Sequence, residues 1–239
     1  MQPLYKRVLI KLSGEALKGE QNFGIEHTAC DHIAQAIKEV YDLGVQVGIV
    51  VGGGNIFRGT QAKDFGFART PADHIGMLAT TINGLILQQS LSALGVPSVV
   101  MSALSDSFVE KYSWSQSMQK IEEGKIIIFV GGTGNPYFST DTAAALRATE
   151  IGAEIVIKAT KVDGVYSDDP KKNPNAKKYE HVTYLEALSQ QLNVMDATAI
   201  ALCKENRIPI YVFNIFQKGA LLKAICQGKG GTLVTGEKQ

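Results

Sequence analysis

The sequence has 239 residues, 45% of them hydrophobic, and its 24 basic and 23 acidic side chains leave a formal net charge of +1. This balance argues against direct nucleic-acid binding and against a protein that lies on a membrane surface. No apolar run approaches the roughly 20 residues of a membrane span, and the three scattered cysteines are typical of reduced thiols in a cytoplasmic protein.

Short apolar runs alternate with longer helical patterns along the chain. The strands predicted from the runs are residues 8–12, 45–51, 97–101, 126–130, 155–158 and 209–213, with a short edge strand at 233–235. The helices predicted from the patterns are residues 28–43, 73–94, 114–123, 140–151, 184–190 and 196–206. Glycines that suit a left-handed helix cap follow four of these helices, at Gly44, Gly95, Gly124 and Gly152.

Strands that are apolar on both faces and separated by helices indicate a mostly parallel sheet between two helix layers, which is a three-layer α/β/α sandwich. We expect a single domain over residues 1–239, with one continuous sheet and no flexible linker. Ligands of such sheets bind beyond the carboxyl ends of the strands, and the glycine-rich turns here all follow strands. The turns should therefore converge on one edge. The polar, proline-broken residues 166–179 are expected to form a long loop.

Lys11 ends the first predicted strand, within the sequence KLSGE. A lysine in an apolar run is costly to bury unless its ammonium group meets an anion. Lys11 is therefore a candidate ligand for phosphate oxygens, with close backbone contacts from Ser13 and Gly14. The alternative, a lysine that snorkels from the strand end into water, is equally compatible with this motif alone.

Residues 52–59 (GGGNIFRG) follow the strand at 45–51. Three consecutive glycines cost much conformational entropy, which favours a turn where the backbone approaches a ligand closely. Arg58 could offer such a ligand's phosphate a bidentate fork, whereas the alternative is a flexible turn with a surface arginine. No GxxxxGK[ST] or GxGxxG sequence occurs, so the P-loop and dinucleotide-binding folds are not indicated.

Asp73 lies at the start of the longest predicted helix, after the start signal Thr70-Pro71-Ala72. On this motif alone a helix cap is the favoured interpretation. The functional alternative is a carboxylate that accepts hydrogen bonds from the hydroxyls of a ligand's sugar.

Residues 131–141 (GGTGNPYFSTD) join a strand, a glycine-rich turn and a helix start, which is an arrangement that binds anions through backbone N–H groups. The Asp141 carboxylate would repel a bound phosphate unless a cation lay between them. Lys11 and Lys158, each at the end of a strand, could supply that cation and offset the charge of a transferred phosphoryl group. The three residues together indicate phosphoryl transfer. Tyr166 could pack against a base and Asp169 could hold a ribose, although on this segment alone a solvated loop is the favoured interpretation.

These motifs together resemble the bacterial UMP kinases of the amino acid kinase superfamily, essentially end to end. The resemblance rests on residues 11–17 (KLSGEAL), 52–59, 73–79 (DHIGMLA), 131–141 and 158–166 (KATKVDGVY). It implies transfer of the γ-phosphoryl group of ATP to UMP, giving UDP and ADP in pyrimidine nucleotide biosynthesis. No protein metal site is expected, because Mg²⁺ would be held mainly by the ATP phosphates.

The resemblance also implies a role for individual residues. The catalytic residues would be Lys11, Asp141 and Lys158. The ATP-binding residues would be Lys11, Leu12, Ser13, Gly14, Gly54, Arg58, Thr160, Tyr166 and Asp169. The UMP-binding residues would be Gly53, Arg58, Asp73, Thr133, Gly134, Asn135, Pro136, Tyr137, Phe138, Ser139 and Thr140. Residues up to about 150 would form the acceptor (UMP) half, and residues 151–239 the ATP-binding half.

The family further implies a cytoplasmic homohexamer, built as a trimer of dimers, that is activated by GTP and inhibited by UTP. Some members carry an arginine and a histidine of the GTP site on the long helix, where this chain has Gln88 and Ser92. Trp114 and Lys125 still fit the pattern. We therefore expect GTP binding to be weaker or differently arranged.

Two alternative functions stay open from the sequence. The first is a carboxylate or amino-acid kinase of the same superfamily, against which Arg58 and the TGNPYFSTD sequence argue. The second is a non-catalytic regulator that senses uridylate. The presence of Lys11, Asp141 and Lys158 favours an active enzyme over that regulator.

Overall fold

A mixed but mostly parallel sheet runs through the computed structural model, which describes residues 2–58, 64–105, 107–170 and 172–237. Its strands are β1 (Arg7–Leu12), β2 (Gln46–Val51), β3 (Ser98–Ser102), β4 (Glu110–Lys111), β5 (Ile126–Val130), β6 (Ile155–Thr160), β9 (His181–Thr183), β10 (Ile210–Asn214) and β11 (Thr232–Thr235). Their order is β4-β3-β5-β2-β1-β6-β10-β11-β9. Only the β10–β11 pairing of this sheet is antiparallel among the described residues.

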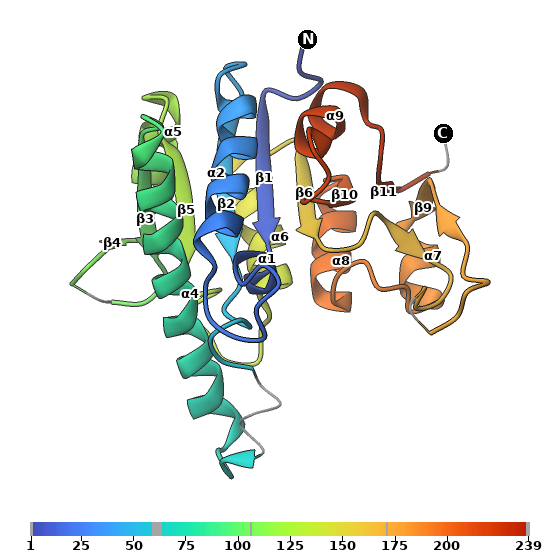
Figure 1. Cartoon of the computed structure of the whole chain (residues 1–239), viewed down its shortest axis with the longest axis horizontal. Helices are drawn as coiled ribbons and strands as arrows, with labels where there is room; N and C mark the ends of the chain where they lie inside the picture. Colours follow the sequence, from blue (N-terminus) through green and yellow to red (C-terminus); the bar gives the residue numbers. More distant parts are fainter. Residues whose placement is uncertain (1, 59–63, 106, 171, 238–239) are drawn as a thin grey trace.

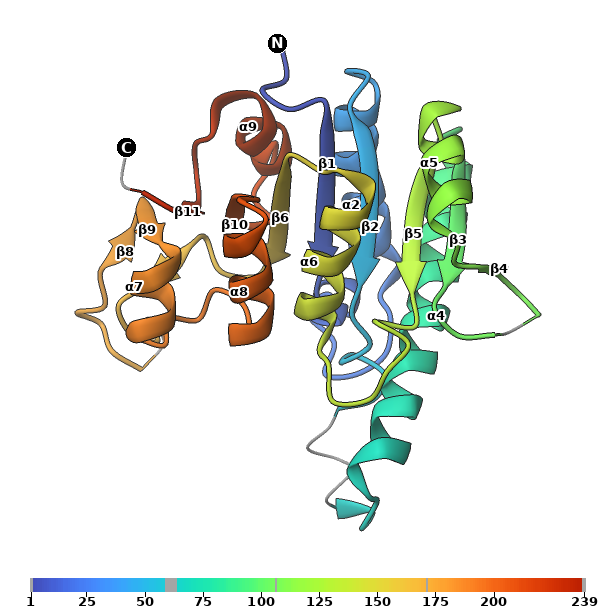
Figure 2. The same ribbon diagram turned by 180° about the vertical axis from the view of Figure 1, so that it is seen from behind.

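Helices cover both faces of the sheet. They are α1 (Gly14–Leu17), α2 (His27–Tyr41), α4 (Arg69–Ala93), α5 (Trp114–Glu122), α6 (Thr140–Ile151), α7 (Tyr184–Ser189), α8 (Ala197–Glu205) and α9 (Ala220–Gln227). Figure 1 shows α2, α4 and α9 over one face, and Figure 2 shows α5, α6 and α8 over the other. The predicted three-layer α/β/α sandwich is confirmed.

Each face has its own apolar core, because side chains alternate along a strand. Ile10 of β1 packs in a cluster with Ile33 of α2, whereas its neighbour Leu9 packs in the cluster that contains Ala144 of α6. All four side chains are fully buried. The sheet is therefore anchored on both sides, and only its edges are free to carry ligands.

The predicted strands and helices are present, with ends that differ by a few residues. The four glycines expected as left-handed caps have φ angles between 64° and 79°. Elements that the sequence did not indicate are α1, α9, β4, β9 and a small antiparallel pair, β7 (Val165–Tyr166) and β8 (Lys178–Tyr179). These elements have two to eight residues, which is too short for a clear periodic pattern.

Helix α4 begins earlier than its pattern suggested, and the interpretation of Asp73 as a cap is wrong. The capping position is Ala68, the helix starts at Arg69, and Asp73 lies in the second turn. Pro71 is tolerated inside the first turn because N–H groups there have no partner within the helix. The early start carries α4 past the carboxyl ends of the strands (Figure 1). No helix in the described part of the chain has the length and apolar character to cross a membrane.

Candidate functional site

Lys11 and Lys158 are in-register neighbours on the parallel strands β1 and β6. Asp141, in the first turn of α6, lies between their ammonium groups. Lys11 Nζ is 2.6 Å from Asp141 Oδ1, and Lys158 Nζ is 3.0 Å from Asp141 Oδ2. The three side chains are between 9% and 14% exposed. One carboxylate therefore bridges two buried ammonium groups, and neither lysine snorkels into solvent.

Burial and charge act in opposite directions on Asp141. Burial favours the neutral acid, but attraction to Lys11 and Lys158 outweighs it and holds the pKa of the carboxyl below its ordinary value. For Lys158 burial dominates, and the like charge of Lys11 adds to it, so the pKa of this ammonium is lowered in spite of Asp141. The carboxylate is firmly ionised, while Lys158 gives up its proton more readily than an exposed lysine.

The turn that carries Asp141 is fixed by Ser139 and by Asp196. Ser139 caps α6, because its Oγ accepts hydrogen bonds from the N–H groups of Asp141 (3.0 Å) and Thr142 (3.2 Å). Its hydroxyl donates to Asp196, which also accepts from Thr142 Oγ1 at 3.0 Å and from the N–H of Ala199 at 2.9 Å. Asp196 thus caps α8 and joins the N-termini of two helices. The sequence analysis did not single it out, although its place before a helical pattern was a capping signal.

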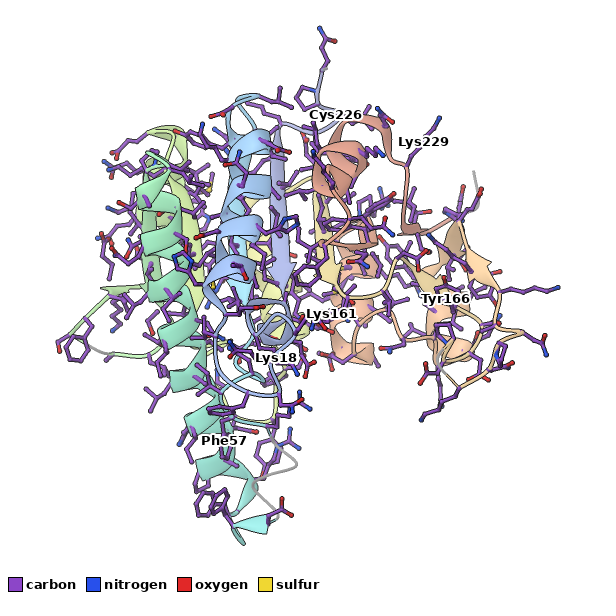
Figure 3. The ribbon with its side chains drawn as sticks, viewed as in Figure 1. Lys18, Phe57, Lys161, Tyr166, Cys226 and Lys229 are labelled. Carbon is purple, nitrogen blue, oxygen red and sulfur yellow. The ribbon has the colours of Figure 1, made fainter. Side chains whose placement is uncertain are left out.

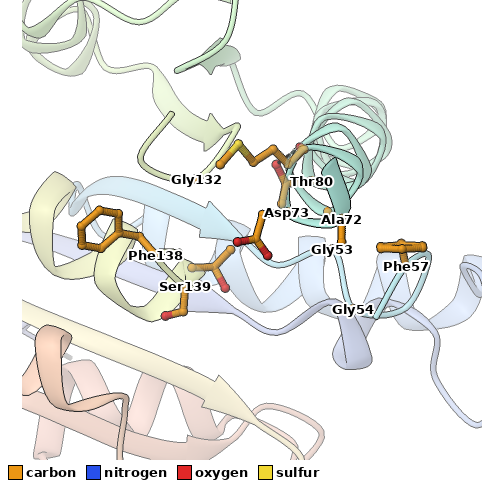
Figure 4. A pocket seen from close by; sticks show the side chains of 12 residues that line it. Gly53, Gly54, Phe57, Ala72, Asp73, Thr80, Gly132, Phe138 and Ser139 are labelled. Carbon is orange, nitrogen blue, oxygen red and sulfur yellow. Dashed lines mark hydrogen bonds between the residues drawn. The ribbon is translucent and has the colours of Figure 1, made fainter. Parts of the chain in front are cut away.

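A cavity of about 260 Å³ opens between α4 and the turns after β2 and β5 (Figure 4). The predicted UMP-binding residues in its lining are Gly53, Asp73, Phe138, Ser139 and Thr140. Phe57, Met77 and Thr80 line it as well, and the sequence analysis did not identify them. In Figure 4 the Asp73 carboxylate lies between Phe138 and Phe57.

Other predicted UMP-binding residues lie outside this lining in the described structure. Thr133 and Asn135 are hydrogen-bonded to each other: the backbone N–H of Asn135 donates to Thr133 Oγ1 at 3.2 Å. Arg58 donates to the Gly54 carbonyl oxygen at 3.0 Å and pairs with the Glu15 carboxylate. The remaining members of the turn after β5 are Gly134, Pro136 and Tyr137. Gly59, the last residue of the GGGNIFRG motif, lies outside the described residues.

Two buried side chains of α4 hold the glycine turns at the edge of the sheet. Asn83 donates to the Gly52 carbonyl oxygen at 2.7 Å, and Thr80 Oγ1 accepts from the Gly131 N–H at 2.7 Å. The side-chain amides of Asn83 and Asn55 also exchange two hydrogen bonds. Asn83 Nδ2 donates to Asn55 Oδ1 at 2.7 Å, and Asn55 Nδ2 donates to Asn83 Oδ1 at 3.1 Å. Both turns therefore rest on one helix, the helix that also carries Asp73.

The turn after β1 touches the turn after β2. A Cβ on Gly14 would lie 2.9 Å from both the Gly52 carbonyl oxygen and the Gly54 nitrogen. Only glycine permits this approach, and the convergence expected for these turns is observed. Gly14 thus lies directly beside Gly54, and the Leu12 carbonyl oxygen accepts from the Gly52 N–H at 2.9 Å.

A second cavity, of about 540 Å³, lies in the C-terminal part of the chain. Its lining includes Tyr166 and Asp169, together with Val162, Gly164, Gln190 and Asn193. The Tyr166 hydroxyl donates to Asp163 at 2.8 Å. Thr160 is outside the described lining, and its Oγ1 accepts from the Val162 N–H at 3.1 Å. Figure 3 shows Tyr166 well separated from Phe57, which marks the first cavity.

Three of the positions for which the resemblance implied a GTP site, Gln88, Ser92 and Lys125, line a cavity of about 320 Å³. Gln88 donates to the Ser98 carbonyl oxygen at 3.0 Å. Lys125 lies 2.8 Å from Glu123, and the indole N–H of Trp114 donates to the Glu150 carbonyl oxygen at 2.7 Å. The side chains of Gln88, Lys125 and Trp114 therefore make their polar contacts with other residues of the same chain.

The chemistry available at the site is that of charge stabilisation. Among the described residues, no group of three or more His, Cys, Asp or Glu side chains is placed to hold a metal ion. Both Asp141 oxygens face lysines, and Asp196 accepts three hydrogen bonds, so neither carboxylate is arranged as a metal ligand. Backbone N–H groups, the two ammonium groups and the Arg58 guanidinium are groups here that can bind phosphate.

Known proteins match this sequence over nearly the whole chain. The model of the amino acid kinase family matches residues 6–214. A uridylate kinase of Protochlamydia amoebophila is 57% identical over 216 residues, which are 90% of this chain and 86% of the relative.

Solved structures of UMP kinases have the same fold as this chain. The crystal structure of UMP kinase from Bacillus anthracis matches with a TM-score of 0.93 and 38% identity, over 98% of this chain and 97% of that one. UMP kinase from Ureaplasma parvum matches with a TM-score of 0.92 and 43% identity, over 98% and 100% of the two chains. The resemblance to the UMP kinases is thereby confirmed, and the chain belongs to the amino acid kinase family.

Proposed function

We propose that this protein is a UMP kinase, which transfers the γ-phosphoryl group of ATP to UMP and forms UDP and ADP in pyrimidine nucleotide biosynthesis. The observation that carries the proposal is the position of the Lys11–Asp141–Lys158 cluster between the two cavities. Thr140, next to Asp141, lines the first cavity. Asn193 lines the second and precedes Val194, whose carbonyl oxygen accepts from Lys158 Nζ at 2.5 Å.

The reaction needs positioning and charge stabilisation more than a covalent partner. A phosphate oxygen of UMP attacks the γ-phosphorus of ATP, the bond to the β-phosphate oxygen breaks, and ADP leaves. Lys11 and Lys158 stabilise the charge on the transferred group, and Asp141 keeps both ammonium groups aimed at it. Because the three side chains are buried, the ammonium groups act with little screening by water.

The acceptor nucleotide belongs in the first cavity under this proposal. Gly53, Arg58 and Thr140 bind its phosphate, and Asp73 binds its ribose. Thr133 and Asn135 lie along the uracil, within the turn completed by Gly134, Pro136, Tyr137, Phe138 and Ser139. The Arg58 guanidinium has five N–H donors, so the phosphate can share or replace its contacts with Gly54 and Glu15.

ATP belongs across the cluster and in the second cavity. Its phosphates meet Lys11, Leu12, Ser13, Gly14 and Gly54, with Arg58 nearby. Its nucleoside meets Thr160, Tyr166 and Asp169. Residues up to about 150 then serve the acceptor, and residues 151–239 serve ATP. Mg²⁺ in kinases is usually held by substrate phosphates, with few ligands from the protein. The described residues include no group of three or more His, Cys, Asp or Glu side chains placed to hold a metal ion. We propose that Mg²⁺ enters the site bound to ATP.

We also propose a cytoplasmic homohexamer, a trimer of dimers, with inhibition by UTP and weakened activation by GTP. Self-association is supported by an apolar stripe on α4, where Ile75, Leu78 and Ile82 are 36%, 53% and 47% exposed. These residues are three and four positions apart and so share one face of the helix. The uncharged Gln88 and Ser92 support the weakened response to GTP.

A coupled assay of ADP formation tests the proposal. It compares UMP, CMP, dTMP, aspartate and N-acetylglutamate as acceptors, with and without GTP and UTP. We expect rapid turnover of UMP and little of the others. Equal rates on the three nucleotides would contradict uridine specificity. Turnover of an amino acid without UMP would establish the carboxylate kinase, and UMP binding without turnover would establish the regulator.

A further inference from the structure

The Asp73 carboxylate is held by two donors at the border of the first cavity. Arg69 Nε lies 3.0 Å from Asp73 Oδ1 and 2.8 Å from Asp73 Oδ2, so its single N–H is shared between both oxygens. The backbone N–H of Tyr137 donates to Asp73 Oδ2 at 2.8 Å. An ionised carboxylate has about four acceptor positions, of which these contacts engage one on Oδ1 and two on Oδ2. One acceptor position therefore remains, on Oδ1 of a residue that lines the cavity.

The stability of α4 does not account for Arg69. Arg69 is the first residue of the helix, where a positive charge is unfavourable because the helix dipole is positive at its N-terminus. Its side chain is 60% exposed, and exposed ion pairs contribute little to stability. Holding Asp73 in one orientation is a role that such a residue can perform despite these costs.

Tyr137 is strained in the same arrangement. Its φ angle is 73°, in the left-handed region that residues other than glycine rarely adopt. The hydrogen bond to Asp73 and the Arg69 guanidinium, 5.3 Å from the centre of its ring, hold it there. The turn after β5 is thus fastened to the start of α4 through Asp73. Neither Arg69 nor Tyr137 belongs to the described lining of the cavity, so both reach its contents only through Asp73.

We propose that Arg69 and the Tyr137 N–H are positioning groups that turn the open acceptor position of Asp73 toward the 2′-hydroxyl of the acceptor's ribose. Arg69 thereby sets the preference for a ribonucleotide over a deoxyribonucleotide. This inference rests on the proposed function and deepens it. A ribose offers its 2′-hydroxyl as the donor for this position, whereas a 2′-deoxyribose leaves the position unmet.

The test measures kcat and KM for UMP and dUMP at saturating ATP in the wild type, R69A, R69Q and R69K. Arg207, exposed beyond the end of α8, provides the matched control R207A. We expect R69A to raise the KM for UMP roughly tenfold, to change kcat less than threefold and to reduce the ratio of kcat/KM for UMP over dUMP by a similar factor. R69K should recover part of this ratio, since an ammonium group keeps the charge without the planar fork. R207A should match the wild type.

An unchanged ratio of UMP to dUMP in R69A would overturn the inference, as would equal losses for both nucleotides, which indicate a structural role only. If R69A does not fold, as judged by its circular dichroism and melting temperature, the ratio of kcat/KM for UMP over dUMP is measured in R69Q instead, with the same expected loss. The wild-type enzyme distinguishes failure of this inference from failure of the proposed function. A wild type that does not phosphorylate UMP would overturn the proposed function as well as the role of Arg69.

Discussion

Asp141 separates two lysines whose like charges would otherwise face each other across adjacent strands. Neighbouring strands lie only about 4.8 Å apart, and Lys11 and Lys158 occupy paired positions. The carboxylate makes this pairing tolerable, and its pKa is lowered because it is attracted to both lysines against the effect of burial. The residue that organises the site is therefore also the residue that allows both ammonium groups to be buried.

Asp141→Asn tests this balance. The amide keeps the size of the side chain but leaves two buried positive charges without a counter-charge. We expect kcat to fall by on the order of 10²–10³, the loss typical of removing one preorganised electrostatic contact. The Kd for UMP, measured by calorimetry, should change little. The exposed Asp42→Asn serves as the control, and a kcat close to that of the wild type in D141N would contradict the role of Asp141.

The lowered pKa of Lys158 predicts the pH dependence of activity. Burial disfavours the ammonium form, so the group loses its charge as the pH rises through a value below the roughly 10.4 of an ordinary lysine. Since the charged form stabilises the transferred group, kcat/KM for ATP should fall on the alkaline side at that lowered pH. In K158R the remaining activity should persist to higher pH, because a guanidinium does not titrate there. An alkaline limb at the same pH in both enzymes would exclude Lys158 as its source.

The sequence singled out Lys11, Asp141 and Lys158, which the structure brings together, but it left the surroundings of some predicted site residues undecided. Lys11 was compatible with burial or with snorkelling, because its partner Asp141 lies far along the chain and only the folded sheet brings them together. Asp73 had a local start signal for a helix, which favoured a cap. The helix instead starts at Arg69, and the capping residue Ala68 has no side-chain oxygen that could have marked this start in the sequence.

Helix α4 is the element on which the proposed acceptor site is built. Its buried face holds the Gly52 and Gly131 turns through Asn83 and Thr80, and its second turn carries Asp73. Gly53 lies directly against it, since a Cβ there would approach the Gly76 carbonyl oxygen to 2.7 Å. The spacing between α4 and the turn after β2 is therefore a structural requirement of the site.

Substitutions at two adjacent glycines test this requirement. Gly53→Ala must push α4 away from the turn, so we expect a loss of about 1–3 kcal/mol in the free energy of unfolding and a weaker Kd for UMP. A Cβ on Gly54 would meet nothing within 4 Å, and neither residue has a left-handed φ. Gly54→Ala should therefore leave the free energy of unfolding within about 1 kcal/mol of the wild type. Equal effects in urea unfolding would show that the contact with α4 does not matter.

Periodicity predicted the elements that are long and buried. Strands β1, β2 and β5 are apolar on both faces and follow clear breaks in the pattern. The pair β7–β8 forms within a segment expected to be a loop, and its strands have two residues each. The lining of the second cavity by Gln190 and Asn193 was not predicted either, because that segment follows a short helix and reaches the cavity only through the packing of α7 and α8.

At the scale of the whole molecule, the length of α4 leaves an apolar surface uncovered. The helix extends beyond the carboxyl edge of the sheet in both views of the ribbon. The three residues of the apolar stripe lie on it, and burying such side chains in a contact contributes about 1.5–3 kcal/mol each. A second copy of the chain is the partner that our proposed homohexamer supplies.

Leu78→Glu tests the contribution of the stripe to self-association. A carboxylate placed in an apolar contact must lose its water, so the assembly should break into smaller species, with a lower mass in sedimentation velocity. Leu185 on α7 is 60% exposed and provides Leu185→Glu as a matched control that should keep the wild-type mass. A monomeric wild type, or an unchanged mass in L78E, would contradict the proposed assembly.

The paired positions of Lys11 and Lys158 also bear on how the chain finds its native sheet. A slip of β1 by one residue would turn Lys11 to the opposite face, into the cluster where Ile10 and Leu12 now pack. An ammonium group without a counter-charge in that cluster would cost several kcal/mol, whereas a strand of apolar residues alone would tolerate the shifted pairing far better. The side chain that we propose acts on phosphate thus penalises misaligned strands during folding, so under this proposal selection for catalysis also protects the register of the sheet.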